Sequence, residues 1–195
     1  MASSARQEIG DTLVVGSYKL GSLLSKGVPG FLSGTMGSLV GLPASLGMRD
    51  KRKMVERHMR RVRPNASSIE IRRLTQQVFD SYARYYLESF RLPTLTSAQV
   101  AASFTVEGYH ENMLPALDRG KGVILALPHL GGWEWAGRWA ADLGNKMTVV
   151  VEPIQPPELF EWFADLRRKF GMTVIPLGPD AGPAVLKSLR NNEVL

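Results

Sequence analysis

Leu125-Ala-Leu-Pro-His-Leu-Gly-Gly-Trp-Glu134 is the stretch that decides the fold of this chain and its candidate chemistry. The apolar run 122–127 leads into it and is typical of a strand buried on both faces of a parallel sheet, which Pro128 ends. His129 should therefore emerge at the carboxyl edge of that strand. On one continuous helix, residues five apart lie about 140° apart, so His129 and Glu134 face a common substrate only if the backbone turns between them.

Two adjacent glycines supply the means for that turn. Gly131 and Gly132 permit backbone conformations that other residues avoid. Glu134 would then lie in the first turn of a helix starting near Gly132, where the helix dipole favours a carboxylate. Backbone N–H groups at such a helix start are also suited to bind an oxyanion. The sequence thus predicts that His129 and Glu134 converge beside a set of amide donors.

Beyond residue 104, apolar runs alternate with helical patterns, which is typical of an α/β domain with a mostly parallel sheet flanked by helices. We expect strands at 104–107, 122–127, 147–152, 172–176 and from 193, and helices at 110–118, 132–143, 157–170 and 181–191. The last apolar run stops at Leu195, so we expect the chain to be truncated at its C-terminus, with residues 67–195 as the N-terminal part of the α/β domain.

Residues 1–66 are expected to form a helical, membrane-associating extension. The segment 27–48 carries no charge over 22 residues, yet it contains six glycines and two prolines. Its apolar residues follow helical spacing at Val28, Phe31, Leu32, Met36, Leu39 and Val40. This pattern favours a helix lying in the membrane interface over a helix docked on the domain's own core or a span.

A basic segment follows the apolar one. Residues 49–73 hold ten Lys and Arg against three acids, whereas the chain as a whole has a net charge of +6. A local basic face on a nearly neutral body suggests an anionic membrane surface as partner, with a solvated helix face as the alternative. We expect Asp50 to cap this helix, which should end near Val62.

A second long helix is expected after Pro64. Ser67 and Glu70 form a capping-box pattern at its start, and it should end near Arg91. One face is marked by apolar and aromatic residues, which are Ile71, Leu74, Val78, Tyr82 and Tyr85. The first residues of the chain lack the pattern of a secretory signal, so we expect a peripheral protein on the cytoplasmic face of the cell membrane.

An ordered set of motifs resembles the lysophospholipid/glycerolipid acyltransferase superfamily, in the branch that holds the lipid A late acyltransferases and the phosphatidylinositol mannoside acyltransferase. The set consists of 86–93, the His129-x-x-x-x-Glu134 motif, 149–152, 163–167 and 171–178. Within the branch, the mannoside enzyme has Asp where this chain has Glu134, and the lipid A relatives accept Glu. The resemblance implies transfer of a long-chain fatty acyl group from acyl-CoA, or acyl carrier protein, to a hydroxyl of a membrane lipid or glycolipid such as a phosphatidylinositol mannoside.

The resemblance also implies roles for individual residues. His129 would be the general base, Glu134 would orient its imidazole, and Glu152 would be a second carboxylate supporting that histidine. Arg167 would serve the acyl donor or charged substrate groups. Gly131, Gly132 and Trp133 would line the substrate site, and the reaction would need no metal and no bound cofactor.

Plainer interpretations of these residues stay open. Glu134 could be an ordinary N-terminal helix charge and Glu152 a strand-end acid facing water. Arg167 could simply complement the dipole at a helix C-terminus.

Two other functions are compatible with parts of the sequence. The first is a metal-assisted hydrolase with His129, Glu134 and Glu152 as ligands, although one histidine and two acids make a poor zinc set. The second is a non-catalytic module that binds anionic lipid or nucleic acid through 49–73. Nucleic acid is not expected as a partner, because the basic run lacks the aromatic residues that stack on single strands.

Overall fold

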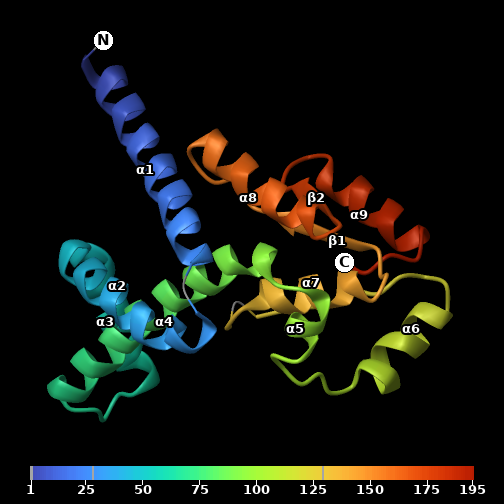
Figure 1. Cartoon of the computed structure of the whole chain (residues 1–195), viewed down its shortest axis with the longest axis horizontal. Helices are drawn as coiled ribbons and strands as arrows, with labels where there is room; N and C mark the ends of the chain where they lie inside the picture. Colours follow the sequence, from blue (N-terminus) through green and yellow to red (C-terminus); the bar gives the residue numbers. More distant parts are fainter. Residues whose placement is uncertain (1, 28, 129) are drawn as a thin grey trace. The chain divides into compact units, whose positions relative to one another are not determined.

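The computed structural model describes residues 2–27, 29–128 and 130–195, and most of them are helical (Figure 1). By their contacts the residues group into two compact units, Gly21–Arg91 and a larger unit of Met1–Leu20 with Leu92–Leu195. The division falls inside the first helix, α1 (Ala2–Lys26). Residue 66, where the sequence analysis ended the N-terminal extension, lies between two helices of the smaller unit.

The smaller unit is built from helices. After the end of α1 come a 3-10 turn, η1 (Gly30–Leu32), and three α-helices, which are α2 (Ser33–Gly47), α3 (Arg49–Val62) and α4 (Ser68–Arg91). The predicted start of α4 is confirmed, because the backbone N–H of Glu70 donates to Ser67 Oγ at 3.2 Å. The expected cap of α3 is wrong: Met48 is its N-cap and Asp50 lies in the first turn. The reason is spacing, since Met48 alone separates α3 from α2.

Small residues attach α2 to α4. A Cβ built on Gly37 would lie 2.9 Å from the backbone oxygen of Asp80 and 3.0 Å from Arg84 Cβ. A Cβ on Gly41 would lie 2.7 Å from Asp80 Cα and 2.8 Å from its nitrogen. One helical turn further on, the buried Ser45 hydroxyl donates to Gln76 Oε1 at 2.6 Å. The two backbones approach so closely because these positions of α2 carry little or no side chain.

The leucines of α2 consequently lie on the surface. Leu39, Leu42 and Leu46 are 64%, 52% and 62% exposed. In the predicted apolar stripe, Leu32 and Val40 are also exposed, whereas Val28 lies outside the described residues. Among the helices that the structure describes, none combines the length and apolar character needed to cross a bilayer.

The predicted face of α4 is only partly correct. Ile71 is buried, but Val78 is 36% and Tyr82 is 60% exposed. The helix packs against α2 through its polar positions, so part of its apolar face is left uncovered. Tyr82 instead meets the ring of Tyr86 edge to face, with centroids 4.9 Å apart.

A parallel sheet lies in the larger unit, as the sequence predicted, although it is small. Strands β1 (Met147–Val151) and β2 (Met172–Pro176) pair in parallel, with Met147 opposite Met172. Beside β1, Val194 forms isolated parallel bridges with both Met147 and Val123. The hydrogen-bonded order is therefore 123–125, 193–195, β1 and β2.

Two expected strands are wrong. The run 122–127 is extended and has one isolated bridge among the described residues, and Ile124 and Leu127 are 62% and 56% exposed. Within the described part of the chain its backbone partners lie at 193–195, so apolar content alone overstated how much of it would be paired and covered. Residues 104–107 form no strand; they connect two helical segments.

The predicted helices of this unit are confirmed to within a few residues. They are the π-helical turn η3 (Tyr109–Met113) with α6 (Leu114–Asp118), α7 (Trp133–Asp142), α8 (Pro157–Lys169) and α9 (Ala181–Arg190). A 3-10 turn, η2 (Leu92–Thr94), and α5 (Ser97–Ala101) precede them. α8 packs against β2, α9 contacts both strands, and α7 contacts β1.

Candidate active site

The segment that leads to the motif is held by the last residues of the chain. Gly122, at φ +73°, donates its N–H to Asn192 Oδ1 at 2.9 Å. A side chain at Gly122 would lie 2.9 Å from the carbonyl oxygens of Leu189 and Glu193, so only glycine fits there. This contact fixes the entry of the run 122–127.

The turn that the two glycines predicted is present. His129 itself lies outside the described residues. Leu130, just after it, is 76% exposed, and Gly131 has φ +64°, a left-handed conformation suited to glycine. Gly132 is the N-cap of α7, and Glu134 lies in the first turn of that helix, as predicted.

The Glu134 side chain is buried and paired. Its residue is 1% exposed, and Arg167, in the last turn of α8, donates from Nη2 to Glu134 Oε1 at 3.2 Å. The two side chains are 2% and 12% exposed. A buried carboxylate requires a compensating charge, because desolvation of an unpaired ion costs several kcal/mol. This pair therefore differs from the ion pair of Arg168 and Glu161, which is exposed to solvent and screened by it.

Aromatic rings hold the guanidinium of Arg167. Its Cζ lies 4.8 Å from the ring centroid of Trp133 and 5.9 Å from that of Phe163. Cation–π contacts of this kind are more favourable when they are shielded from water. The Arg167 Nε–H is buried and has no hydrogen-bond partner among the described residues, so one donor of the guanidinium is not used by them.

These contacts distinguish between the interpretations that the sequence left open. A solvated helix charge would not be 1% exposed, so Glu134 is not one. Arg167 likewise does more than complement a helix dipole, since its charge is directed at a carboxylate on another helix. Phe163 was missed at the sequence level, although its i, i+4 spacing to Arg167 on one helix indicated that the two side chains would meet.

Glu152 is placed differently. It follows β1 directly, is exposed, and has no hydrogen bond or ion pair among the described residues. The parallel bridges show that β1 and the run before the motif point the same way, so Glu152 follows its strand toward the same sheet edge. That edge is where open α/β sheets collect ligands.

The remaining tryptophans of α7 are half-buried and pack against neighbouring groups. Trp139 meets Phe104 and Tyr109 edge to face, with centroids 5.8 and 5.0 Å apart. Trp135 is half-buried, and its indole Nε1 has no partner among the described residues. A Cβ on Gly132 would lie 3.0 Å from Trp135 Cδ1, so this ring packs against the cap of its own helix.

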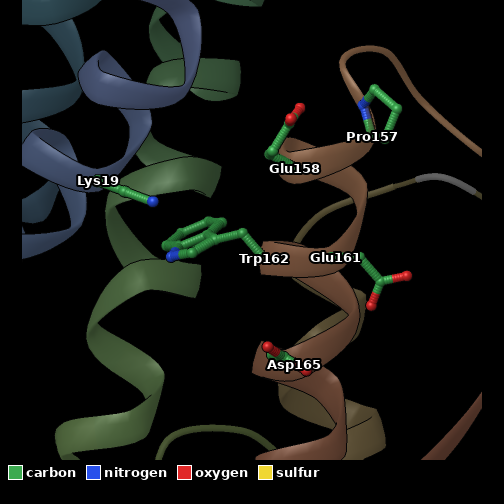
Figure 2. Close-up of a pocket in the computed structure, with 6 residues that line it drawn as sticks. All are labelled: Lys19, Pro157, Glu158, Glu161, Trp162 and Asp165. Carbon is green, nitrogen blue, oxygen red and sulfur yellow. The ribbon is translucent and has the colours of Figure 1, made fainter. Parts of the chain in front are cut away.

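An open hollow of about 410 Å³ lies between α1 and α8 (Figure 2). It is lined by one lysine, one tryptophan, one proline and three acids, namely Lys19, Trp162, Pro157, Glu158, Glu161 and Asp165. Figure 2 shows the Lys19 side chain pointing from α1 toward the Trp162 ring. Three carboxylates against one ammonium disfavour a phosphate-bearing ligand such as an acyl-CoA headgroup in this hollow.

A polar network closes the sheet on the side of β1. The buried Thr148 hydroxyl donates to Glu193 Oε2 at 2.8 Å, and Ser188 Oγ donates to Thr148 Oγ1 at 3.1 Å. Desolvation alone would raise the pKa of Glu193. Hydrogen bonds from Thr148, Ser188 and Asn191, with the charge of Lys146, outweigh it and lower that pKa below its ordinary value.

No group of three His, Asp or Glu side chains that could hold a metal ion occurs among the described residues. The guanidinium at 3.2 Å from Glu134 also opposes a metal ion at that oxygen, because the two positive charges would repel each other.

The family described as bacterial lipid A biosynthesis acyltransferase matches residues 4–195. Phosphatidylinositol mannoside acyltransferase from two strains of Mycobacterium tuberculosis is 38% identical over 120 residues, which cover 60% of this chain and 38% of the relative. The enzyme of the same name from Mycolicibacterium smegmatis is 38% identical over 97 residues, covering 50% of this chain and 32% of the relative. The matched part of the chain thus spans well under half the length of these curated relatives.

Proposed function

Because the chain belongs to the bacterial lipid A biosynthesis acyltransferase family, we propose that it transfers a long-chain fatty acyl group to a hydroxyl of a membrane lipid or glycolipid. The donor is acyl-CoA or acyl carrier protein. A phosphatidylinositol mannoside is the proposed type of acceptor, which the names and 38% identity of the mycobacterial relatives support. The observation that carries the proposal is the buried Glu134, five residues after His129 and bonded to Arg167.

In the proposed reaction, His129 accepts the proton of the acceptor hydroxyl. The oxygen attacks the thioester carbonyl, and the tetrahedral oxyanion collapses with loss of the thiolate, which takes the proton back from the imidazolium. Glu134 fixes the tautomer of His129 and stabilises its charged form. Arg167 supports this role, because its guanidinium binds the buried carboxylate and limits its position.

The other proposed site residues act on the substrate. Backbone N–H groups of Gly131 and Gly132, at the start of α7, donate to the oxyanion, and Trp133 contacts the acyl donor. Glu152 is the proposed second carboxylate at the sheet edge. The chemistry requires a base and oxyanion donors, so no metal or bound cofactor is part of the proposal, and acyl-CoA serves as a co-substrate.

The proposed location is the cytoplasmic face of the cell membrane, with peripheral attachment to anionic lipid. The exposed leucines of α2 are available for apolar insertion, and α3, which has no buried residue, adds basic side chains in the same unit. Apolar burial and electrostatic attraction together give the stable binding that either alone would not. Nucleic acid is not a proposed partner.

Acyl transfer can be tested with a labelled long-chain acyl-CoA and a membrane lipid extract, followed by identification of the labelled product. His129→Ala should reduce formation of labelled lipid by about 10²–10⁴-fold, as expected for loss of a general base. The matched control is His58→Ala, because His58 is exposed on α3. If His129→Ala keeps more than about a tenth of the wild-type rate, His129 is not the base. Label appearing only as free fatty acid would favour hydrolysis of the acyl-CoA over acyl transfer to lipid.

A further inference from the structure

Helix α1 contributes one aromatic ring to the packing around α8. Tyr18 meets Phe163 edge to face, with ring centroids 5.7 Å apart and planes at 76°. Tyr18 lies on the half-buried face of α1, one turn after Val15, whereas Leu13 and Leu20 on the same helix are 68% and 57% exposed. The contact is therefore made by the half-buried side of α1, within the larger unit.

The same Phe163 ring lies close to the guanidinium that holds Glu134. Phe163 is 9% exposed, and Arg167, one turn later on α8, is within 5.9 Å of its centroid. Arg167 in turn binds Glu134 Oε1 and lies 4.8 Å from the Trp133 ring. A continuous series of contacts thus runs from Tyr18 to Glu134, across three helices.

Each contact in the series restricts the next group. Arginine has many rotamers, and its planar guanidinium fixes a carboxylate well only when its own orientation is limited. Phe163 limits it, and the edge of Tyr18 limits how the Phe163 ring can tilt. Removal of Tyr18 should leave the charge of Arg167 intact but loosen the geometry of the pair.

We propose that Tyr18 is a positioning residue for the reaction, acting through Phe163 and Arg167 on the carboxylate of Glu134. This inference rests on the proposed acyl transfer. Helix α1 would then help to position Glu134, because it carries Tyr18, the first ring in the series of contacts.

The test compares Tyr18→Ala with Tyr18→Phe in the full chain, and Ser17→Ala, an exposed neighbour, is the matched control. Tyr18→Ala should lower kcat by roughly 2- to 10-fold, the effect of losing one aromatic pair, without changing the KM for the acceptor. Tyr18→Phe keeps the ring and should restore kcat. Unchanged kcat in a folded Tyr18→Ala protein, or a loss confined to KM, would overturn the proposal.

A second measurement does not depend on activity. Amide hydrogen exchange at residues 133–136, the first turn of α7, should be faster in Tyr18→Ala than in Tyr18→Phe or Ser17→Ala. If no variant transfers acyl groups, the proposed function fails, while exchange still decides whether Tyr18 is coupled to Glu134. Equal exchange in all three variants would show that it is not.

A double-mutant cycle tests whether Tyr18 acts through Arg167. Arg167→Lys keeps the charge but removes the planar group that the rings hold. If Tyr18 acts through Arg167, Tyr18→Ala should have little further effect on exchange in the Arg167→Lys background. Strictly additive effects would contradict the proposed series of contacts.

Discussion

Helices α8 and α2 bury opposite kinds of residues. α8 covers the sheet with Leu159, Phe163, Ala164 and Leu166 and turns Glu158, Glu161 and Asp165 outward. α2 packs on its neighbour with Gly37, Gly41 and Ser45 and leaves its leucines exposed. A helix in water gains by burying leucine, and α8 follows this rule whereas α2 does not; we propose that the exposed leucines of α2 meet lipid. In this account, one helix supports the chemistry and the other reaches the lipid.

Equal substitutions on the two helices should give unequal losses of stability. Leu159→Ala in α8 removes a side chain that is 5% exposed and should lower the free energy of unfolding by about 2–5 kcal/mol. Leu46→Ala in α2, where the leucine is 62% exposed, should change it by less than about 0.5 kcal/mol. Urea denaturation measures both. Equal losses would mean that the α2 leucine is covered by this chain and would remove the contrast.

Stability contributed by α2 should depend on its glycines. Gly41→Ala places a methyl group 2.7 Å from Asp80 Cα, so the helices must separate, at a cost of about 1–3 kcal/mol. Gly47→Ala on the same helix meets no atom within 4 Å and should be neutral or stabilise the protein by up to about 1 kcal/mol. Thermal unfolding of the two variants measures this difference in stability. A stable Gly41→Ala protein would show that α2 does not need the close approach.

Membrane binding should need the exposed face of α2. Replacing Leu39 and Leu46 together by Ser should weaken sedimentation with anionic liposomes, whereas Leu143→Ser, at an exposed leucine beyond α7, should not. Each Lys or Arg near the lipid surface adds about 1 kcal/mol, so high salt should weaken binding of the wild type without abolishing it. Equal affinity for neutral and anionic liposomes would exclude an electrostatic contribution to membrane binding.

The smallest effect on stability is expected at Glu193, which belongs to neither α8 nor α2. The pKa of Glu193 is lowered in the folded state, so its contribution to stability is present above the ordinary glutamate pKa and is lost as the pH falls through the folded value. The difference in urea midpoint between wild type and Glu193→Gln should therefore be largest at neutral pH and disappear only after the pH has fallen below the lowered pKa of the folded state. Exposed Glu107 supplies the control, Glu107→Gln. A difference that persists in acid would assign the effect to packing.

Local rules predicted the turn before α7 and the place of Glu134, because a glycine pair and a helix start are set by residues a few positions apart. The parallel pairing of β1 and β2 also followed from alternation along the chain. The partner of Glu134 was not predicted, since Arg167 is 33 positions away and only the packing of α8 brings it there. Apolar content was misleading at 122–127, because burial of a segment depends on which neighbour packs against it.

The most direct test of the account is the turnover of Glu134→Gln in the labelled acyl-transfer assay, with Glu158→Gln on the exposed side of α8 as control. Removing the charge leaves Arg167 unpaired, so a melting curve must first show a folded protein. Glu134→Asp keeps the charge and should retain more activity than Glu134→Gln. The account predicts a loss of about 10²-fold or more for Glu134→Gln and none for Glu158→Gln. A folded Glu134→Gln protein that turns over at the wild-type rate would contradict it.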